Sequence, residues 1–170
     1  MTFDPEPARR EDTQPTTYNL LFVCTGNTCR SPLAEAIARQ AIERRAWTHV
    51  SVRSAGISTL PGAPASDGAQ RIAHEHGLDL SEHMSNPLTT DLIGWADLVL
   101  GMGPSHLVGV AELGGAEKVA LVTDFLDDDA LGTAIEDPFG GDDDAFRETY
   151  QQLDHAISGL LSRLEPILAP

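Results

Sequence analysis

The chain has 170 residues, of which 41% are apolar, and it carries a formal net charge of −15 at pH 7. This length suits one domain with a hydrophobic core, and no apolar run approaches the roughly 20 residues that a transmembrane helix needs. A negative charge of this size opposes binding to nucleic acid or to an anionic membrane surface, so we expect neither as a partner.

The N-terminal stretch, residues 1–17, combines prolines with charges of both signs and has no apolar segment. It lacks the apolar core of a secretory signal, and we therefore predict a disordered leader followed by one domain over residues 18–166. The two cysteines, Cys24 and Cys29, lie five positions apart in one loop and do not form a disulfide scaffold. Their placement favours a cytoplasmic location.

Along the rest of the chain, segments typical of strands alternate with segments typical of helices. Apolar or alternating runs predict strands at 18–23, 49–55, 96–102 and 118–123. Helical patterns are expected at about 32–45, 65–76, 103–113 and 145–164, whereas 78–92 is irregular or briefly helical. The alternation predicts an α/β fold: a single domain of three layers, in which helices flank a four-stranded parallel sheet.

The stretch from Cys24 to Arg30 lies between the first predicted strand and the first predicted helix. Ligands of parallel sheets bind at the carboxyl ends of the strands, and loop amides beside a helix N-terminus favour a phosphate. The same surroundings stabilise the thiolate form of Cys24, while the planar guanidinium of Arg30 matches two phosphoryl oxygens. This stretch therefore predicts a phosphate cradle that contains its own nucleophile.

The other residues of the loop suit this interpretation. Gly26 allows close approach of the backbone, Asn27 tolerates a left-handed conformation, and Ser31 could both cap the following helix and donate to the thiolate. The expected phosphate-binding residues are Thr25, Gly26, Asn27, Thr28, Cys29, Arg30 and Ser31.

A thiolate that attacks phosphorus must expel a leaving group, which needs a proton. Asp137 is the candidate acid, with Arg30 and Cys24 as its catalytic partners. Asp-Pro is by itself a turn pattern, but this segment follows the last predicted strand and so belongs to the same edge of the sheet as the cysteine loop.

Residues 23–32, with the sequence VCTGNTCRSP, resemble the signature of the low-molecular-weight protein tyrosine phosphatase family. Weaker matches follow in the family's order over residues 18–164: Ser54-Ala55-Gly56, Pro64-Ala65-Ser66, Leu80-Ser81-Glu82-His83, 96–102 and Asp137-Pro138-Phe139. The resemblance implies a flavodoxin-like fold and a two-step phosphoryl transfer without metal or other cofactor. In that reaction Cys24 forms a phosphocysteine, Arg30 and the loop amides hold the phosphoryl oxygens, and Asp137 protonates the leaving group and then activates water.

Two positions bear on the substrate. Tyrosine phosphatases of this family often have a bulky aliphatic residue where this chain has Thr28, and tyrosines where it has Phe139-Gly140-Gly141. Both departures resemble the protein arginine phosphatase branch. A threonine hydroxyl can accept from a guanidinium N–H, and Phe139 could stack on the guanidinium plane. We therefore expect phosphoarginine in proteins as the substrate, with phosphotyrosine as the alternative.

Several further interpretations stay open or are disfavoured at this point. Arsenate reduction needs a later cysteine, and none follows Cys29. A phosphoryl-binding or redox-sensing module without catalysis would not need Asp137. Cys29 either packs or acts as the family's second loop cysteine, which can pair with the nucleophile under oxidation. The six histidines show no metal spacing and are interpreted as surface or packing residues. The partners expected are phosphorylated proteins, and the oligomeric state is open, with a monomer as the expectation.

Overall fold

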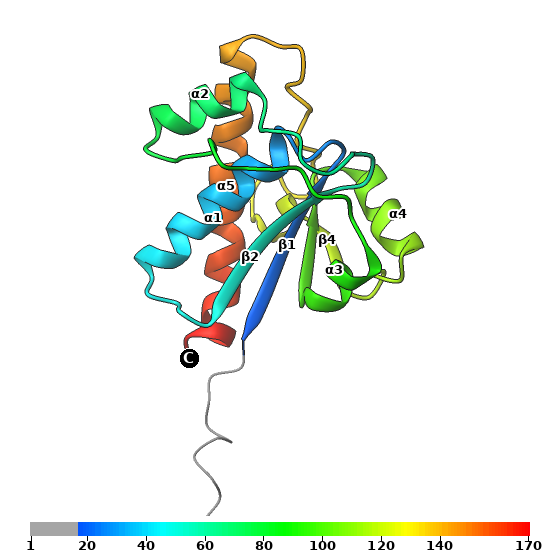
Figure 1. Cartoon of the computed structure of the whole chain (residues 1–170). Coiled ribbons are helices and arrows are strands. Elements are labelled where there is room, and N and C mark those ends of the chain that lie inside the picture. The colour runs from blue at the N-terminus through cyan, green and yellow to red at the C-terminus, as the bar shows by residue number, and fades with distance from the viewer. Residues whose placement is uncertain (1–16) are drawn as a thin grey trace, which may run out of the picture.

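A parallel β-sheet lies between two layers of helices. A computed structural model describes residues 17–170, so the predicted leader lies, except for its last residue, outside the described residues. Four parallel strands form the sheet in the order β2-β1-β3-β4 (Figure 1). Their bounds are β1 Tyr18–Cys24, β2 Val50–Gly56, β3 Leu98–Gly101 and β4 Val119–Leu121. The predicted α/β fold with a four-stranded parallel sheet is confirmed.

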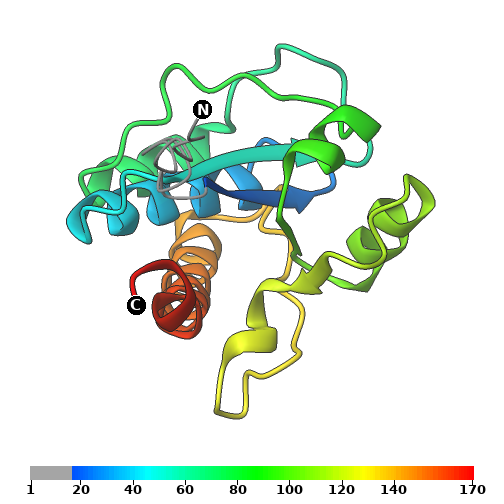
Figure 2. The same cartoon turned by 90° about the horizontal axis from the view of Figure 1, so that it is seen from below.

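Helices cover both faces of this sheet (Figure 2). One face packs on α1, α2 and α5, and the other on α3 and α4. The bounds are α1 Arg30–Arg44, α2 Asp67–Glu75, α3 Thr90–Trp95, α4 Pro104–Glu112 and α5 Asp143–Leu168, with a 3-10 turn, η2, at Val122–Phe125. Within residues 17–170, none of these helices combines the length and the apolar character that crossing a membrane requires.

The central strand β1 explains why the core has two sides. Leu20 and Phe22 pack among residues of the α1 and α5 side, while Leu21 and Val23 pack among residues of the α3 and α4 side. All four are fully buried, as expected for a strand covered on both faces. Side chains alternate along the strand, so one apolar run supplies both halves of the core.

Two expectations about helix boundaries need correction. The prediction that Ser31 caps α1 is wrong, because the cap position is Cys29, without a side-chain hydrogen bond, and Ser31 lies inside the helix. Residues 78–92, expected to be irregular or briefly helical, end within helix α3, which continues to Trp95. Helix α3 has six residues, which are too few to show a helical period. Its start is nevertheless capped by Thr89, whose hydroxyl accepts from Leu92 N at 3.1 Å.

The topology places the cysteine loop at the point where the strand order reverses. β1 has β2 on one side and β3 on the other, so the connections from β1 and β3 leave in opposite directions. The loop after β1, the start of α4 after β3 and the end of β2 therefore meet at the carboxyl edge of the sheet (Figure 1).

Gly56 at the end of β2 is needed for this close approach. A Cβ at this position would lie 2.6 Å from the carbonyl oxygen of Thr25 and 3.0 Å from the amide nitrogen of Asn27. We predict that Gly56→Ala displaces the loop and lowers the free energy of unfolding by about 1–3 kcal/mol, measured by urea denaturation.

The matched control is Gly94→Ala inside α3, where an added Cβ meets nothing within 4 Å. This variant should be as stable as wild type or gain up to about 1 kcal/mol, because alanine is the better helix former. Equal stability of Gly56→Ala and wild type would contradict the prediction.

Candidate active site

The peptide groups of the loop between β1 and α1 face in a common direction. Four carbonyls accept hydrogen bonds from surrounding segments: Cys24 O from Ile57 N, Thr25 O from Ser58 N, Asn27 O from His83 Nε2 and Thr28 O from Ser66 N. Because the carbonyl and the next amide of a planar peptide point in opposite directions, the amides are turned inward. Within residues 17–170, the amides of residues 25–29 have no protein acceptor, so they are free to bind an anion.

Asn27 holds the loop from behind. It adopts a left-handed conformation with φ 54°, and its side chain is completely buried. Its Nδ2 donates to Ser31 Oγ at 2.7 Å and to Ser54 Oγ at 2.9 Å, while its Oδ1 accepts from Asn86 N at 2.8 Å. The polar atoms of the Asn27 side chain therefore all bind protein groups around the loop. Only the backbone amide of Asn27 remains for the predicted phosphate contact.

Cys24 ends β1 and is almost fully buried. Its Sγ lies 2.9 Å from Ser31 Oγ. Since Ser31 Oγ already accepts from Asn27 Nδ2, its own proton can go to the sulfur at 2.9 Å or to Ala55 O, which lies farther away at 3.5 Å. The nearer contact joins the two atoms between which the sequence predicts a hydrogen bond.

Arg30 presents an open edge of its guanidinium to the pocket. Its Nη1 donates to Ile135 O at 2.9 Å, and its Nη2 lies 3.4 Å from Thr25 Oγ1 and 3.7 Å from Asp137 Oδ2. Among the buried side-chain nitrogen and oxygen atoms of residues 17–170, Arg30 Nε is the one without a hydrogen-bond partner. The Nε and Nη2 edge is therefore the one that can bind two oxygens of a single phosphoryl group.

Asp137 reaches the pocket from the segment before α5, more than 100 positions after Cys24. Its Oδ1 accepts from Phe139 N at 3.1 Å, which fixes the carboxylate in the Asp-Pro turn. The preceding Ile135 bonds through its amide to Met102 O and through its carbonyl to Arg30. These bonds anchor the Asp137 segment beside the loop.

These residues enclose one cavity of about 230 Å³. It brings together the three predicted catalytic residues and both predicted selectivity residues, Thr28 and Phe139, the second of which is 76% exposed at the rim. Asn27 and Ser31, in contrast, lie behind the cavity. Its lining consists of Cys24, Thr25, Gly26, Thr28, Cys29, Arg30, Asp137 and Phe139.

The second cysteine of the loop differs from the first. Cys29 is buried, and its Sγ lies 3.2 Å from Ser66 Oγ. Burial raises the pKa of the Cys29 thiol above its usual value, although the bond to Ser66 partly opposes this. Cys29 is therefore a neutral thiol at neutral pH. Both cysteines are free.

The interpretation of the histidines as surface or packing residues misses two that touch the loop. His83 Nε2 donates to Asn27 O at 2.8 Å. His106 is buried in the first turn of α4, and its Nε2 lies 3.0 Å from Thr25 Oγ1. Both come from segments far along the chain, and no local spacing in the sequence connects either of them with Cys24.

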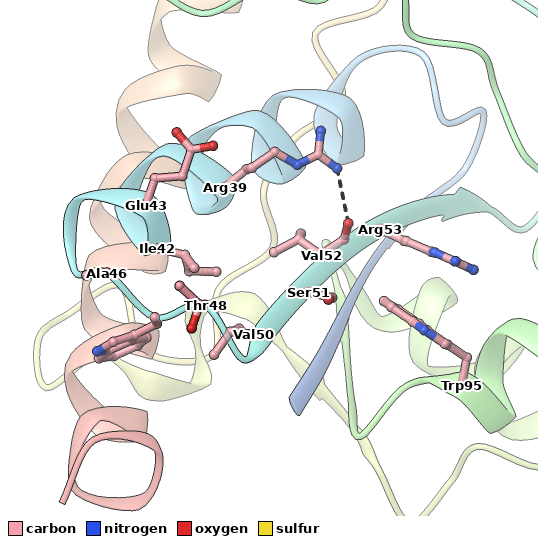
Figure 3. A pocket seen from close by; sticks show the side chains of 11 residues that line it. Arg39, Ile42, Glu43, Ala46, Thr48, Val50, Ser51, Val52, Arg53 and Trp95 are labelled. Carbon is pink, nitrogen blue, oxygen red and sulfur yellow. Dashed lines mark hydrogen bonds between the residues drawn. The ribbon is translucent and has the colours of Figure 1, made fainter. Parts of the chain in front are cut away.

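A larger cavity, of about 690 Å³, lies elsewhere, between α1, the outer edge of β2 and Trp95 (Figure 3). Arg39 donates there to Val52 O, and the guanidinium of Arg53 lies 4.5 Å from the ring centre of Trp95. No cysteine lines this cavity, and it shares no residue with the site around Cys24. A search for the larger of these two cavities would therefore not lead to the one around Cys24.

Comparisons with known proteins agree with this geometry. A family described as low molecular weight phosphotyrosine protein phosphatase matches residues 19–167. A protein-arginine-phosphatase of Bacillus subtilis is 37% identical over 149 residues, which is 86% of this chain and 97% of that protein. A probable low molecular weight protein-tyrosine-phosphatase, EpsP, of Ralstonia solanacearum is 33% identical, covering 87% of this chain and 97% of the relative.

Among solved structures, a YwlE arginine phosphatase mutant with a phosphorylated active-site serine matches with a TM-score of 0.80 at 36% identity. The match covers 86% of this chain and 95% of that one. The chain therefore belongs to the low molecular weight phosphotyrosine protein phosphatase family, as the motifs around Cys24 predicted.

The Nε and Nη2 edge of Arg30 leads to a testable prediction about phosphate binding. The three N–H donors of lysine share one nitrogen, so lysine cannot reproduce the planar fork with which arginine reaches Ile135 O and two phosphoryl oxygens from separate nitrogens. We predict that Arg30→Lys weakens the binding of inorganic phosphate by about 10-fold or more, in line with the loss of a charge-assisted bidentate contact. Isothermal titration calorimetry measures the dissociation constant.

Arg163→Lys is the control, because Arg163 pairs with Asp127 on the surface, remote from the cavity lining. Its phosphate affinity should equal that of wild type. Unchanged affinity in Arg30→Lys would show that the guanidinium edge does not hold the anion.

Proposed function

We propose that this protein is a cysteine-dependent protein phosphatase that hydrolyses phosphoarginine through a phosphocysteine intermediate. One observation carries the proposal: a buried thiol with a hydrogen-bond donor, a guanidinium whose Nε has no partner among residues 17–170, and a carboxyl group line a single small cavity. Cys24, Arg30 and Asp137 supply these three groups. Membership of the phosphatase family supports the same reaction type.

In the first step, the Cys24 thiolate attacks phosphorus. A P–S bond forms as the P–N bond to the substrate guanidinium breaks, and Asp137 gives its proton to the departing nitrogen. The loop amides and the Nε and Nη2 of Arg30 hold the three phosphoryl oxygens, whose charge is shared out in the transition state. Ser31 stabilises Cys24 as a thiolate before the attack and as a leaving group afterwards.

In the second step, water attacks the phosphocysteine. Asp137, now ionised, takes a proton from the water as the new P–O bond forms and the P–S bond breaks. Inorganic phosphate leaves, and Cys24 returns to the thiolate. Asp137 lies about half exposed and 3.7 Å from Arg30 Nη2, where both leaving group and water can reach it.

Thr28 and Phe139 support phosphoarginine as the substrate. Thr28 lines the cavity beside Cys24, where its hydroxyl can accept from a guanidinium N–H. Phe139 lies exposed at the rim, where its ring is free to stack on the same planar group. Relatives named protein-arginine-phosphatase support this assignment, while those named protein-tyrosine-phosphatase support phosphotyrosine as the second candidate.

The substrates in this proposal are phosphorylated proteins in the cytoplasm. The acidic surface, with a net charge of −15, suits target segments that are basic, as arginine-containing segments are. The proposal treats the protein as a monomer, in which Cys24, Arg30 and Asp137 of the same chain line the cavity.

The acid role of Asp137 has a direct test. We predict that Asp137→Asn lowers kcat by about 10²–10⁴-fold, because the leaving group departs without a proton, while phosphate affinity changes little. Stopped-flow or steady-state release of inorganic phosphate measures kcat. Asp129→Asn, in an exposed acidic loop, is the matched control and should retain full activity.

Cys24→Ser, whose hydroxyl is a much weaker nucleophile, should abolish turnover on every substrate. Hydrolysis of phosphoarginine or of an aryl phosphate by Cys24→Ser at the wild-type rate would refute the enzyme mechanism.

The choice of substrate is tested at Thr28. We predict that Thr28→Ile lowers kcat/KM for a phosphoarginine peptide by about 10-fold or more, because a buried guanidinium N–H loses its acceptor. Activity on a phosphotyrosine peptide of otherwise equal sequence should be unchanged or higher. Release of phosphate from both peptides, at equal concentrations, gives the ratio.

Thr28→Ser, which keeps the hydroxyl and removes only a methyl group, serves as the control and should keep the preference for phosphoarginine. A wild-type enzyme that prefers phosphotyrosine, with no loss of phosphoarginine activity in Thr28→Ile, would assign the protein to the tyrosine phosphatases instead.

A further inference from the structure

His106 is a buried titratable residue to which the proposed reaction assigns no task. It lies in the first turn of α4, directly after β3, with 2% of its surface exposed. A Cβ on Gly101 would lie 3.0 Å from His106 Cβ, so the glycine at the end of β3 gives the imidazole its place against the sheet. The residue is thus built into the edge of the sheet that carries the active-site loop.

The hydrogen bonds of the ring define its tautomer. Nδ1 lies 3.1 Å from Met102 N and 3.0 Å from Gly103 N, and both of these amides are donors. Nδ1 must therefore be an acceptor without a proton, and the ring proton is on Nε2. Burial, with the nearby charge of Arg30 as a second cause, lowers the pKa of His106 to about 4. The neutral Nε2–H form is consequently the one present around neutral pH.

This Nε2–H donates to Thr25 Oγ1 at 3.0 Å. The same oxygen faces a second donor, Arg30 Nη2, at 3.4 Å. A hydroxyl oxygen has two acceptor positions and one proton. With both acceptor positions directed at N–H groups, the proton of Thr25 must point away from His106 and Arg30. Thr25 lines the cavity beside Cys24, so the remaining direction opens toward the phosphoryl site.

We propose that His106 is a positioning residue: as an Nε2–H donor it orients the Thr25 hydroxyl so that its proton points into the cavity, toward the negative charge of the reacting phosphoryl group. The inference rests on the proposed phosphatase function and adds a donor to its phosphate cradle. A hydroxyl held in this direction needs no reorientation when the phosphoryl group reacts, which is the condition for effective electrostatic stabilisation.

The two ring nitrogens of His106 can be tested separately. In His106→Asn, the amide oxygen can replace Nδ1 as the acceptor for Met102 N and Gly103 N, but no atom reaches Thr25. In His106→Gln, the longer side chain can place its N–H near the position of Nε2, while the acceptor for the two amides is lost. The first variant removes the bond to Thr25, and the second removes the structural cap of α4.

We expect His106→Asn to lower kcat about 10-fold, a fraction of the loss seen when a full oxyanion donor is deleted, with an unchanged Tm. His106→Gln should recover most of kcat relative to His106→Asn, with a lower Tm. The opposite pattern, a full kcat in His106→Asn or no recovery in a folded His106→Gln, would show that the histidine acts only as a cap and would overturn the proposal.

A double-mutant cycle connects His106 with Thr25. Thr25→Val keeps the shape of the side chain and removes the hydroxyl, so it should also lower kcat about 10-fold or more. If His106 acts through Thr25, adding His106→Asn to Thr25→Val costs no further activity. Independent, multiplying losses would contradict a role through Thr25. KM and Tm are measured for all four proteins, so that losses from misfolding are recognised.

Two readouts do not depend on turnover. Nitrogen NMR of the His106 ring in the full chain should show a protonated Nε2 and an unprotonated Nδ1 from pH 6 to 8; an imidazolium or the other tautomer would overturn the proposal. Calorimetry with inorganic phosphate should show weaker binding by His106→Asn than by wild type, and equal binding would count against the proposal. Should neither phosphoarginine nor an aryl phosphate be hydrolysed, the proposed function fails, while these two measurements still decide the role of His106.

Discussion

The direction of the peptide groups in the loop after β1 is the constraint on which the site depends. An anion can be held by backbone amides only if the carbonyls of the same loop are turned away from it and find donors elsewhere. Three other parts of the chain supply those donors, which bind Cys24 O, Thr25 O, Asn27 O and Thr28 O. The left-handed Asn27 makes the necessary reversal, and Gly56 leaves room for it. The loop thus acquires its shape from its neighbours before any ligand binds.

Arg30 connects the loop after β1 with the segment that carries Asp137. The nitrogens of its guanidinium differ in their partners: Nη1 donates to Ile135 O, Nη2 lies near Thr25 Oγ1 and Asp137, and the buried Nε has no partner among residues 17–170. The segment that carries Asp137 is therefore held beside the loop by the same side chain that we propose binds the phosphate. His106 contacts a further polar group of the site through its hydrogen bond to Thr25 Oγ1.

Several elements of the fold and residues of the candidate site could be predicted from the sequence alone, because the patterns that indicate them are local. The apolar run of β1 and the helical period of α5 are long enough to define their elements, whereas the six residues of α3 are not. Cys24 ends β1 and Arg30 begins α1, with only a short loop between them, so their closeness follows from chain connectivity. The predicted cap at Ser31 failed for a physical reason. Its hydroxyl bonds to Cys24 Sγ and Asn27 Nδ2, and such tertiary partners cannot be recognised from its neighbours in sequence.

The amino-acid sequence was sufficient for the fold class and the family, and for selecting Cys24 and Arg30 as the proposed nucleophile and phosphate-binding residue, because each depends on contiguous patterns of polarity and spacing. The folded chain was needed for every contact across long separations: Asp137 with Arg30, His83 with Asn27 and His106 with Thr25. It also showed that Asn27 and Ser31 serve the loop from behind, although they lie within the motif. The physical reason is that a side chain's partners are set by the packing of distant segments, and a one-dimensional pattern contains no record of that packing.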